Sequence, residues 1–449
     1  MDAEEYNQEQ LDACITENKM KAPETNNDLG PAEAFNMMFE TQIGPTGQLK
    51  GYLRPETAQG IFLNWRRLIE YNNGKMPCAG ATIGMGFRNE INPRQGLLRV
   101  REFALAEIEH FVDPLDKTHH KFDLIKDQVL PLWTKGAQEE MGEVKSDLTL
   151  GEAVEQGIVG NQTLAYFMAR SYKFFCLLGV KTDAIRYRQH RNNEMAHYAQ
   201  DCWDAEIETS FGWIEVAGHS DRSCFDLAKH SEKTKVELVA ARPLKEPKLV
   251  KFIRVTLEKA KIGKTFKKDG QKVLKAIDAW TNEDHEGLFA QMEEKKEITI
   301  TVDGAEFKLG EDMIKFERAE KTILEEKYVP HVIEPSFGIG RTIYCVLEHA
   351  FRMRENDAAR TYFHFKALVA PIKCSLLPLM TKPDLVKKSY ELKALLTAAG
   401  MSSKLDDSGQ SVGKRYARTD ECGIPYAFTI DFDTLEKGTV TMREIDTMK

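Results

Sequence analysis

The spacing of apolar and polar residues divides the first half of the chain into strands and helices. Between residues 35 and 111, short strand-like runs surround one amphipathic helix predicted over 57–71. Its apolar stripe consists of Ile61, Phe62, Trp65, Leu68 and Ile69. Residues 117–200 are predicted to be mostly helical. A strand pair at 202–209 and 213–218 follows, joined by a tight Ser-Phe-Gly turn.

The pattern changes after residue 366, where strands and helices alternate. Strands are predicted at 367–370, 403–405 and 426–432, and a helix at 384–399 that Gly400 ends. This alternation indicates a small α/β domain with a largely parallel sheet. Strands that follow one another directly, as in the first half, indicate an antiparallel sheet instead. The predicted fold class is therefore α+β, with an antiparallel sheet and flanking helices, followed by a small α/β domain.

A chain of 449 residues exceeds what one hydrophobic core usually supports, so several domains are expected. The predicted units are an N-terminal lead-in at 1–34, a first core segment at 35–229 with a helical insertion at about 117–200, an insertion at 230–325, a second core segment at 326–360, and a C-terminal domain at 361–449. No apolar run approaches the roughly 18 residues of a membrane helix, so no membrane partner is expected.

Charge is informative only locally. The net charge of −8 argues against nucleic-acid binding through the whole surface. Between residues 242 and 275, however, twelve Lys or Arg residues stand against three acidic ones, with two phenylalanines interleaved. This basic run could contact phosphates, and a solvated lysine-rich surface is an equally open interpretation.

The cysteine pattern favours free thiols and no zinc. The eight cysteines are scattered without a CxxC pair, which fits a reducing compartment. The nearest approach to a metal site is His219, Cys224 and His230, whose irregular spacing suits neither a zinc ribbon nor a finger, so these residues are expected to be structural. The acidic N-terminus lacks the order of a signal peptide. A cytoplasmic location is expected, and an organellar form stays open.

Residues 81–112 form the most informative segment, predicted as strand, glycine-containing loop and strand. Alternation places Gly84, Gly86, Arg88 and Glu90 on one face of the first strand, and Arg99, Arg101, Phe103, Leu105, Glu107 and Glu109 on one face of the second. Such a row suits a nucleotide joined to an amine. An arginine can bind phosphate, Phe103 can stack on a base, and Glu107 can accept hydrogen bonds from an ammonium. An exposed hairpin whose charges pair with one another is the alternative.

A second group of polar residues lies at 332–351. A short strand with Glu334 and Ser336 continues into Gly338 and Gly340, and a helix begins near Arg341. Glycines before a helix let the backbone approach a ligand, and the helix N-terminus favours anions. Alone, this turn is a weak signal.

Several ordered motifs resemble one family. FRNE, the loop and REF resemble motif 2 of class II aminoacyl-tRNA synthetases, and FGIGR resembles motif 3. The strings YLRPETAQGIF, REFALAEIEHFVDP, MAHYAQDCWDAE, GWIEVAGHSDRSCFD and GKRYARTDECGIPYAFTIDFDT are together similar to eukaryotic-type glycyl-tRNA synthetases, from about Tyr6 to the C-terminus. The resemblance implies a glycine–tRNA ligase that activates glycine with ATP and transfers it to tRNA(Gly). It also implies the class II sheet and an anticodon-binding domain at 361–449.

The same resemblance implies roles for individual residues. Arg88 and Arg341 would be catalytic, Arg88 on the α-phosphate and Arg341 sandwiching the adenine with Phe103. The implied ATP contacts also include Asn89, Glu90, Arg99, Val100, Glu215 and Val216, and Glu215 would hold Mg²⁺. Those to glycine are Glu56, Glu107, Glu334, Pro335 and Ser336, with Arg222 on the glycine carboxylate or a phosphate.

Partner binding is implied less sharply. Lys414, Arg415 and Arg418 would contact tRNA, or would instead form salt bridges with Asp406, Asp407 and Asp420. From the resemblance, the motif 1 segment that builds the family's homodimer interface and the last helix of the anticodon-binding domain are expected to have no counterpart here, which puts the homodimer in doubt. The alternative function is therefore a catalytically impaired, truncated paralogue that binds RNA or protein. An enzyme for proline or threonine is a weaker rival, because AEIEHF and VIEPSFG supply the carboxylates that an unsubstituted amino acid would use.

Overall fold

The computed structural model describes residues 6–140, 142–144, 147–355 and 357–449, and residues 1–5 of the predicted lead-in lie outside them. The chain forms two compact units. The first comprises Met1–Leu238 and Val329–Lys449, and the second is Val239–Tyr328. No helix in the described part is long and apolar enough to cross a membrane.

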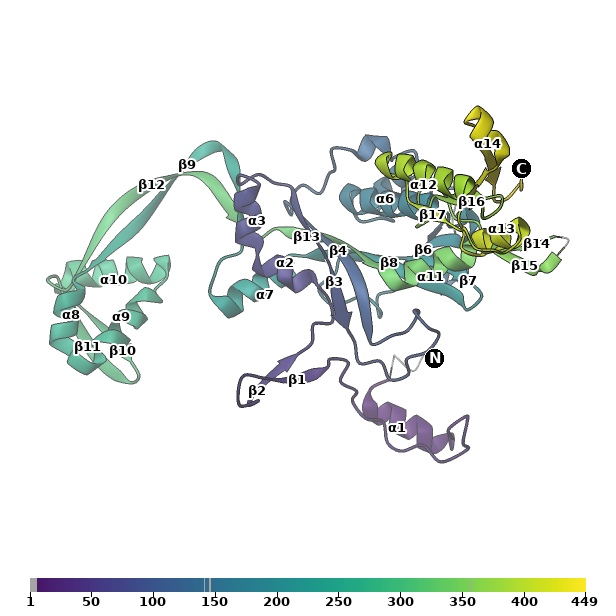
Figure 1. Ribbon diagram of the computed structural model, residues 1–449. Coiled ribbons are helices and arrows are strands. Elements are labelled where there is room, and N and C mark those ends of the chain that lie inside the picture. Colours follow the sequence, from purple (N-terminus) through teal and green to yellow (C-terminus); the bar gives the residue numbers. More distant parts are fainter. Residues whose placement is uncertain (1–5, 141, 145–146, 356) are drawn as a thin grey trace. The chain divides into compact units, whose positions relative to one another are not determined.

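A seven-stranded sheet forms the centre of the first unit (Figure 1), with the strand order β3-β4-β13-β8-β7-β6-β5. Its strands are β3 (Cys78–Phe87), β4 (Glu102–Val112), β5 (Leu132–Trp133), β6 (Ile185–Gln189), β7 (Asp201–Thr209), β8 (Gly212–Ser223) and β13 (His331–Gly338). All neighbouring pairs are antiparallel except β5 and β6. The predicted antiparallel sheet is confirmed, with one parallel edge strand. β13 enters the middle of the sheet although it is the last of these strands in the sequence.

The two faces of this sheet differ in polarity because side chains alternate along each strand. One face is apolar and carries Tyr187, Trp203, Ala205, Ala217 and Ile333, which pack in the main core with helix α6 (Gln162–Leu178). The side chain of Asn161 caps the start of α6, and Gly179 ends the helix in a left-handed conformation at φ 94°. Helix α11 (Ile339–Ala350) follows β13 directly and contributes Cys345 and Val346 to the same core.

The helix predicted over 57–71 is two short helices, α2 (Ala58–Leu63) and α3 (Trp65–Tyr71). The chain turns at Asn64, whose side-chain amide donates to the carbonyl of Gly60 and so favours a break. The apolar stripe still points inward: Phe62 and Trp65 are fully buried and pack against Phe111 of β4. Helix α7 (Phe225–Thr234) packs beside α2.

Other parts of the first unit are small. The N-terminal region holds α1 (Gln8–Glu17) and the hairpin of β1 (Glu40–Ile43) and β2 (Leu49–Tyr52). The segment predicted as helical contains η2 (Phe122–Leu124), α4 (Lys135–Glu139), α5 (Leu150–Glu155), α6 and η3 (Thr182–Ala184), and also the strands β5 and β6.

The C-terminal part of the first unit is a four-stranded sheet in the order β17-β16-β18-β19. Its elements are β16 (Cys374–Pro378), α12 (Pro383–Ala398), β17 (Ser403–Leu405), α13 (Val412–Glu421), β18 (Tyr426–Ile430), α14 (Phe432–Lys437) and β19 (Thr441–Glu444). A small hairpin, β14 (Phe351–Arg354) and β15 (Asp357–Phe363), precedes them. Strand β16 is parallel to β17 and β18, and β19 is antiparallel, so the predicted small α/β domain with a largely parallel sheet is confirmed.

The strand predicted at 367–370 is wrong. Residues 367–369 form a turn, and the strand begins at Cys374. The ammonium group of Lys373 donates to the carbonyls of Ala367, Leu368 and Ala370, which holds this turn closed. A lysine that satisfies three carbonyls from beyond the turn leaves no signal in the alternation of apolar residues.

The second unit has its own core. Two long antiparallel strands, β9 (Ala240–Leu257) and β12 (Ile314–Tyr328), run side by side as a ribbon (Figure 1). They carry α8 (Lys259–Phe266), η4 (Lys267–Asp269), α9 (Gly270–Asp278), α10 (Asn282–Lys295) and the hairpin of β10 (Glu297–Val302) and β11 (Ala305–Gly310). Buried residues such as Ile262, Val273 and Ile298 fill the centre. The first residues of the predicted 230–325 insertion belong to α7 and hence to the first unit.

Candidate functional site

The polar face of the seven-stranded sheet lines a cavity of about 550 Å³. Alternate residues of four strands point into it, including Phe103 and Glu107 of β4, Glu334 and Ser336 of β13, Val216, Gly218 and Arg222 of β8, and Cys202 and Asp204 of β7. A cavity of this size holds a ligand of several hundred daltons. The sheet therefore separates an apolar core on one face from a polar binding cavity on the other.

Most site residues predicted from the sequence meet at this cavity. Its walls include Glu56, Arg88, Glu90, Arg99, Val100, Phe103, Glu107, Glu215, Val216, Arg222, Glu334, Ser336 and Arg341. Asn89 and Pro335 are not among the described residues that line it, and a contact of either with a ligand stays a prediction. The side chain of Asn89 instead donates to the carbonyl of Asn36, 3.1 Å away. Pro335 lies between Glu334 and Ser336, so alternation turns it to the opposite face.

One end of the cavity combines two arginines with an aromatic ring. The Arg88 guanidinium lies 5.4 Å from the centre of the Phe103 ring, in cation–π geometry. Arg88 is exposed, and among the described residues its side chain donates a single long hydrogen bond of 3.4 Å, to the carbonyl of Pro55. A β-carbon at Gly86 would lie 2.9 Å from Phe103, so glycine is what lets the ring lie against β3. This end offers a flat ring and a cation with free hydrogen-bonding capacity.

Arg341 is the second arginine at this end, and it is held in place. Its Nε donates to the carbonyl of Leu98 at 3.0 Å, and one terminal nitrogen donates to the carbonyl of Glu215 at 3.0 Å and its carboxylate at 3.3 Å. These bonds connect the start of α11 to the loop before β4 and to β8. The guanidinium plane is therefore fixed before any ligand arrives.

The other end of the cavity is a pocket of carboxylates. Glu107 is almost fully buried, and one of its oxygens accepts from the backbone N–H of Thr57 at 2.6 Å and from the Thr57 hydroxyl. Its other oxygen accepts from the hydroxyl of Ser336 at 3.1 Å. Glu107 is thus oriented by neutral donors, which leave its charge uncompensated for a cationic ligand.

Arg222 is the cation in this pocket, and carboxylates of the wall accept several of its hydrogen bonds. It donates to both oxygens of Asp226, at 2.8 and 3.2 Å, and to Glu334 at 2.6 Å, while Glu56 lies 3.8 Å away. Its guanidinium also lies 4.9 Å from the ring centre of Tyr198. Carboxylates of the wall accept three of the five N–H donors of this guanidinium, and pairing of Arg222 with the carboxylate or phosphate of a ligand stays a prediction.

Burial perturbs the ionisation of these groups. It raises the pKa of Glu334 to about 7, although Arg222 opposes the change. Behind it, Glu109 is completely buried, and within the described residues neither of its oxygens has a hydrogen-bond partner. Burial, together with Glu334, raises the pKa of Glu109 well above its usual value. Burial lowers the pKa of Arg222, but Glu334 and Asp226 outweigh it and raise that pKa overall.

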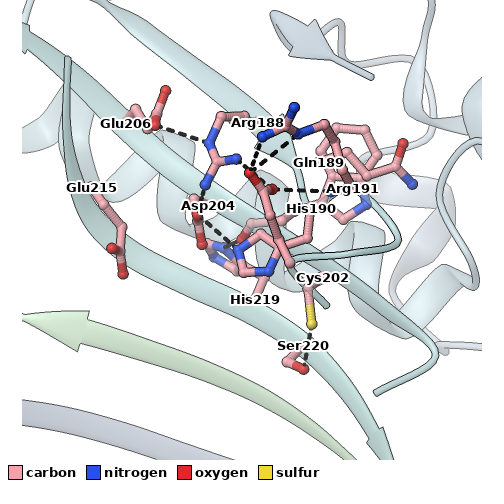
Figure 2. Close-up of polar contacts among 12 residues, drawn as sticks. Arg188, Gln189, His190, Arg191, Cys202, Asp204, Glu206, Glu215, His219 and Ser220 are labelled. Atoms are coloured by element: carbon pink, nitrogen blue, oxygen red, sulfur yellow. Dashed lines mark hydrogen bonds and ion pairs between the residues drawn. The ribbon is translucent and has the colours of Figure 1, made fainter. Parts of the chain in front are cut away.

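Sequence reasoning missed a charged network on β6, β7 and the loop between them (Figure 2). Arg188 donates to Glu194 at 2.9 Å, to Asp204 at 2.8 Å and to Glu206 at 3.2 Å. His190 shares the Asp204 oxygen at 2.8 Å, and this hydrogen bond raises the pKa of His190. His190, Glu194 and Asp204 all line the cavity. Polar residues at every second position, Arg186 to His190 and Cys202 to Glu206, were the signal that could have revealed it.

No group of three or more His, Cys, Asp or Glu residues is arranged to hold a metal ion within the described ranges. The Nε2 of His230 lies 2.5 Å from the side-chain oxygen of Gln59, and His219 is buried against Tyr187 and Phe337. The carboxylate of Glu215 is about half exposed, with 53% of the side chain accessible. A single carboxylate fits Mg²⁺ when phosphate oxygens and water supply the other ligands.

The cations expected to contact RNA in the C-terminal domain divide into three cases. Arg415 is buried, and it donates to the carbonyls of Gln410, Pro378, Asp406 and Leu379, so it is neither an RNA contact nor a salt-bridge partner. Arg418 pairs with Asp406 at 2.8 Å. Lys414 is exposed.

The remaining predicted pairings and the basic run also find partners. Asp420 is bound by Arg354 and Arg443, at 3.0 and 2.8 Å. Part of the basic run is neutralised within the second unit, for example Lys251 by Glu320 and Lys272 by Asp303. Both facts reduce the positive charge that is available to a nucleic acid.

Known protein families match two successive segments of the chain, and the first segment includes the second unit. Residues 46–350 match the family described as tRNA synthetase class II core domain (G, H, P, S and T), and residues 368–449 match the anticodon binding domain. Among solved structures, the prolyl-tRNA synthetase of Giardia lamblia in complex with prolyl-adenylate is similar in fold, with a TM-score of 0.50 and 14% identity over 92% of this chain and 57% of that one.

Close relatives cover the whole chain. A glycine–tRNA ligase of Caenorhabditis elegans is 48% identical over 99% of this chain and 60% of its own length. That of Methanocaldococcus jannaschii is 44% identical over 100% of this chain and 78% of its own length. The chain thus spans about 60% of the length of the first curated relatives it matches. Sequence identity of 44% and 48% over nearly the whole chain, together with the matched core domain, places the chain in the class II tRNA synthetase family, in the group of the glycine–tRNA ligases.

Proposed function

We propose that this chain activates glycine with ATP and transfers the glycyl group to the terminal adenosine of tRNA(Gly). The observation that carries the proposal is the division of one cavity into two ends. One end offers Arg88, Phe103 and Arg341, and the other offers Glu56, Glu107 and Glu334. A nucleotide and a small ammonium can be bound there next to each other, as the formation of an aminoacyl-adenylate requires.

At the nucleotide end, the adenine would lie between Phe103 and the fixed guanidinium of Arg341, and Arg88 would bind the α-phosphate. Glu90, Arg99 and Val100 would complete this end. Asn89 would act only by holding the loop between β3 and β4. Mg²⁺, held by Glu215 and phosphate oxygens, would supply charge neutralisation at the leaving pyrophosphate. The name of the related prolyl-tRNA synthetase structure, which includes prolyl-adenylate, supports adenylate chemistry in this fold.

At the amino-acid end, the ammonium of glycine would add a cationic partner to Glu107, Glu334 and Glu56. Hydrogen bonds between charged groups contribute about 1.5 to 3 kcal/mol each, so three of them suffice for a ligand with no side chain. The neutral donors Thr57 and Ser336 orient Glu107 without cancelling its charge. Alanine would be excluded sterically, and no editing site would be required.

Catalysis would come from position and charge. A glycine carboxylate oxygen attacks the α-phosphorus, and the bond to pyrophosphate breaks. In the second step a ribose hydroxyl of tRNA attacks the glycyl carbonyl, and AMP leaves. Arg88 would stabilise the charge that develops on the α-phosphate, and the rigid sheet would hold both reactants in line.

Binding of tRNA is the less developed part of the proposal. The anticodon binding domain at 368–449 supports tRNA as a partner, with Lys414 and Arg418 as RNA contacts. The unpaired cations of the basic run would add non-specific affinity. A cytoplasmic location is proposed with this function, because all eight cysteines are free thiols, as in a reducing compartment.

The decisive experiment is ATP–pyrophosphate exchange with each of the twenty amino acids. We expect exchange that depends on glycine and on no other amino acid. Exchange driven by proline or threonine would contradict the assigned substrate. Absence of exchange, together with retained tRNA binding, would favour a catalytically impaired paralogue. Gel filtration of the same sample would show whether activity accompanies a homodimer.

A further inference from the structure

A row of residues crosses the polar face of the sheet. The strand registers place Glu107, Ser336, Gly218, Asp204 and Arg188 next to one another on five neighbouring strands. Only Gly218 in this row has no side chain. The row therefore has a gap at its centre, between the hydroxyl of Ser336 and the carboxylate of Asp204.

The fold does not require a glycine at this position. Gly218 is not in the left-handed region, so its backbone conformation suits any residue. A β-carbon there would meet one atom within 4 Å, the Asp204 carboxylate oxygen at 3.9 Å, which is an ordinary contact. By contrast, a β-carbon at Gly80 would lie 2.8 Å from Ile61. Neither strain nor crowding accounts for glycine at position 218.

The cavity accounts for it instead. Gly218 pairs with Ser336 and Asp204, which line the cavity, whereas Ala217 and His219 pack on the core side of the sheet. A side chain at 218 would therefore project into the cavity. Along β8, Val216 lies toward the Arg341 end, and Ser220, which is paired with Glu334, lies toward the carboxylates. Gly218 thus lies at the junction between the nucleotide end and the amino-acid end.

We propose that the open space over Gly218 is the seat of the bond that forms between the glycine carboxylate and the α-phosphate. The inference rests on the proposed function and adds a residue that determines where the two reactants meet. In the reaction, a carboxylate oxygen of glycine forms a bond to the α-phosphorus. At the same time the bond between that phosphorus and the bridging oxygen of pyrophosphate breaks, and the electron pair of the broken bond leaves with pyrophosphate. A methyl group at position 218 would separate the carboxylate from the phosphorus.

The test is Gly218→Ala, assayed by glycine-dependent exchange. We expect kcat to fall at least 100-fold. The melting temperature should stay equal or rise, because alanine loses less backbone entropy than glycine in a strand. The matched control is Gly136→Ala in α4, where a β-carbon would meet no atom within 4 Å and which does not line the cavity. This control should keep exchange within twofold of the unmodified protein.

Binding of two ligands shows which part of the cavity the Gly218→Ala substitution disturbs. Adenosine, which has no phosphate, should bind Gly218→Ala within twofold of the unmodified protein. A glycyl-sulfamoyl-adenosine, which imitates the adenylate, should bind at least 100-fold more weakly. Loss of adenosine binding or a lower melting temperature would overturn the inference, because the methyl group would then disturb the nucleoside or the fold.

The outcome also separates this inference from the proposed function. Exchange by Gly218→Ala within threefold of an active unmodified protein would overturn the inference alone. An unmodified protein that neither catalyses exchange nor binds the analogue would overturn both.

Discussion

Carboxyl groups dominate the amino-acid end of the cavity at the level of single residues. Glu56, Glu107, Glu109, Asp226 and Glu334 surround one cation, Arg222. Burying an unpaired charge is costly, and this explains why burial raises the pKa of both Glu109 and Glu334. The pocket therefore carries more negative than positive charge. An ammonium group would neutralise this excess, whereas a further anion would increase it.

The raised pKa of Glu334 predicts a pH dependence of substrate binding. With a pKa of about 7, the carboxyl is mostly protonated at pH 6 and mostly ionised at pH 8. The ammonium of glycine keeps its proton in this range. The KM for glycine should therefore fall by about tenfold from pH 6 to pH 8, as expected for a titration centred between them. Exchange kinetics at constant ionic strength would measure it.

The control for this effect is Glu334→Gln. It should have a high KM that no longer changes with pH in this range. A similar KM decrease in this variant would contradict the role of Glu334, and would point to Glu109, which also has a raised pKa, as the titrating group.

Arg88 provides a second test at the scale of the residue. Arg88→Ala should reduce glycine-dependent exchange by more than tenfold, because the α-phosphate would lose a charged donor in the transition state. Stability should be unchanged, since Arg88 is exposed. Arg66→Ala, an exposed arginine outside the cavity walls, is the matched control. Exchange by Arg88→Ala at the rate of the unmodified protein would show that Arg88 is not a catalytic residue.

At the scale of the element, helix α13 places two adjacent cations in different environments, because Arg415 is buried and Lys414 is exposed. Replacing the buried Arg415 with Met would leave four carbonyls without their donor, and should lower the free energy of unfolding by about 3 kcal/mol or more. Lys414→Met, at an exposed position, should change it by less than about 0.5 kcal/mol. Urea denaturation would compare the two.

The same pair of variants also tests RNA contact. Lys414→Met should weaken tRNA binding and lower its dependence on salt, because one phosphate contact is lost. If tRNA affinity and salt dependence are unchanged by Lys414→Met, the helix is not an RNA contact at this position.

Elements that alternate regularly could be predicted from the sequence, whereas long-range contacts could not. Within β4, the predicted face of Phe103, Leu105 and Glu107 does line the cavity. Arg88 and Glu90 lie beyond the end of β3, so alternation alone did not determine their position. The break at Asn64 and the turn held by Lys373 depend on single side-chain hydrogen bonds, which no periodicity records.

The site was predicted in the same uneven way. Motif strings identified many residues that line the cavity, but they gave no warning that wall carboxylates bind Arg222. The network around Arg188 depends on the register between β6 and β7, which a single strand does not reveal. The burial of Arg415 depends on carbonyls of the loop between β17 and α13 and of the end of β16, which lie far apart in the sequence.

At the scale of the molecule, the second unit is separable from the cavity. All residues known to line the cavity in the described ranges belong to the first unit. Ala240 and Tyr328 face each other at the base of the β9–β12 ribbon, so an Asn-Gly turn could replace residues 241–327. The shortened protein should retain glycine-dependent exchange within about threefold.

A milder deletion serves as the comparison. Leu257 and Ile314 are paired at the far end of the ribbon, so the same turn could replace residues 258–313 and keep both strands. Both variants should keep their melting temperature within a few degrees. A folded variant without exchange would show that the second unit contributes to the chemistry after all.

The central position of β13 has a consequence for how the protein is made. A nascent chain completes β4 and β8 long before β13 emerges from the ribosome, and β13 is the strand that joins them. Until residue 338 has been translated, the sheet exists as two halves with open edges, which invite pairing with other chains. Chaperones that shield strand edges would matter most during this interval.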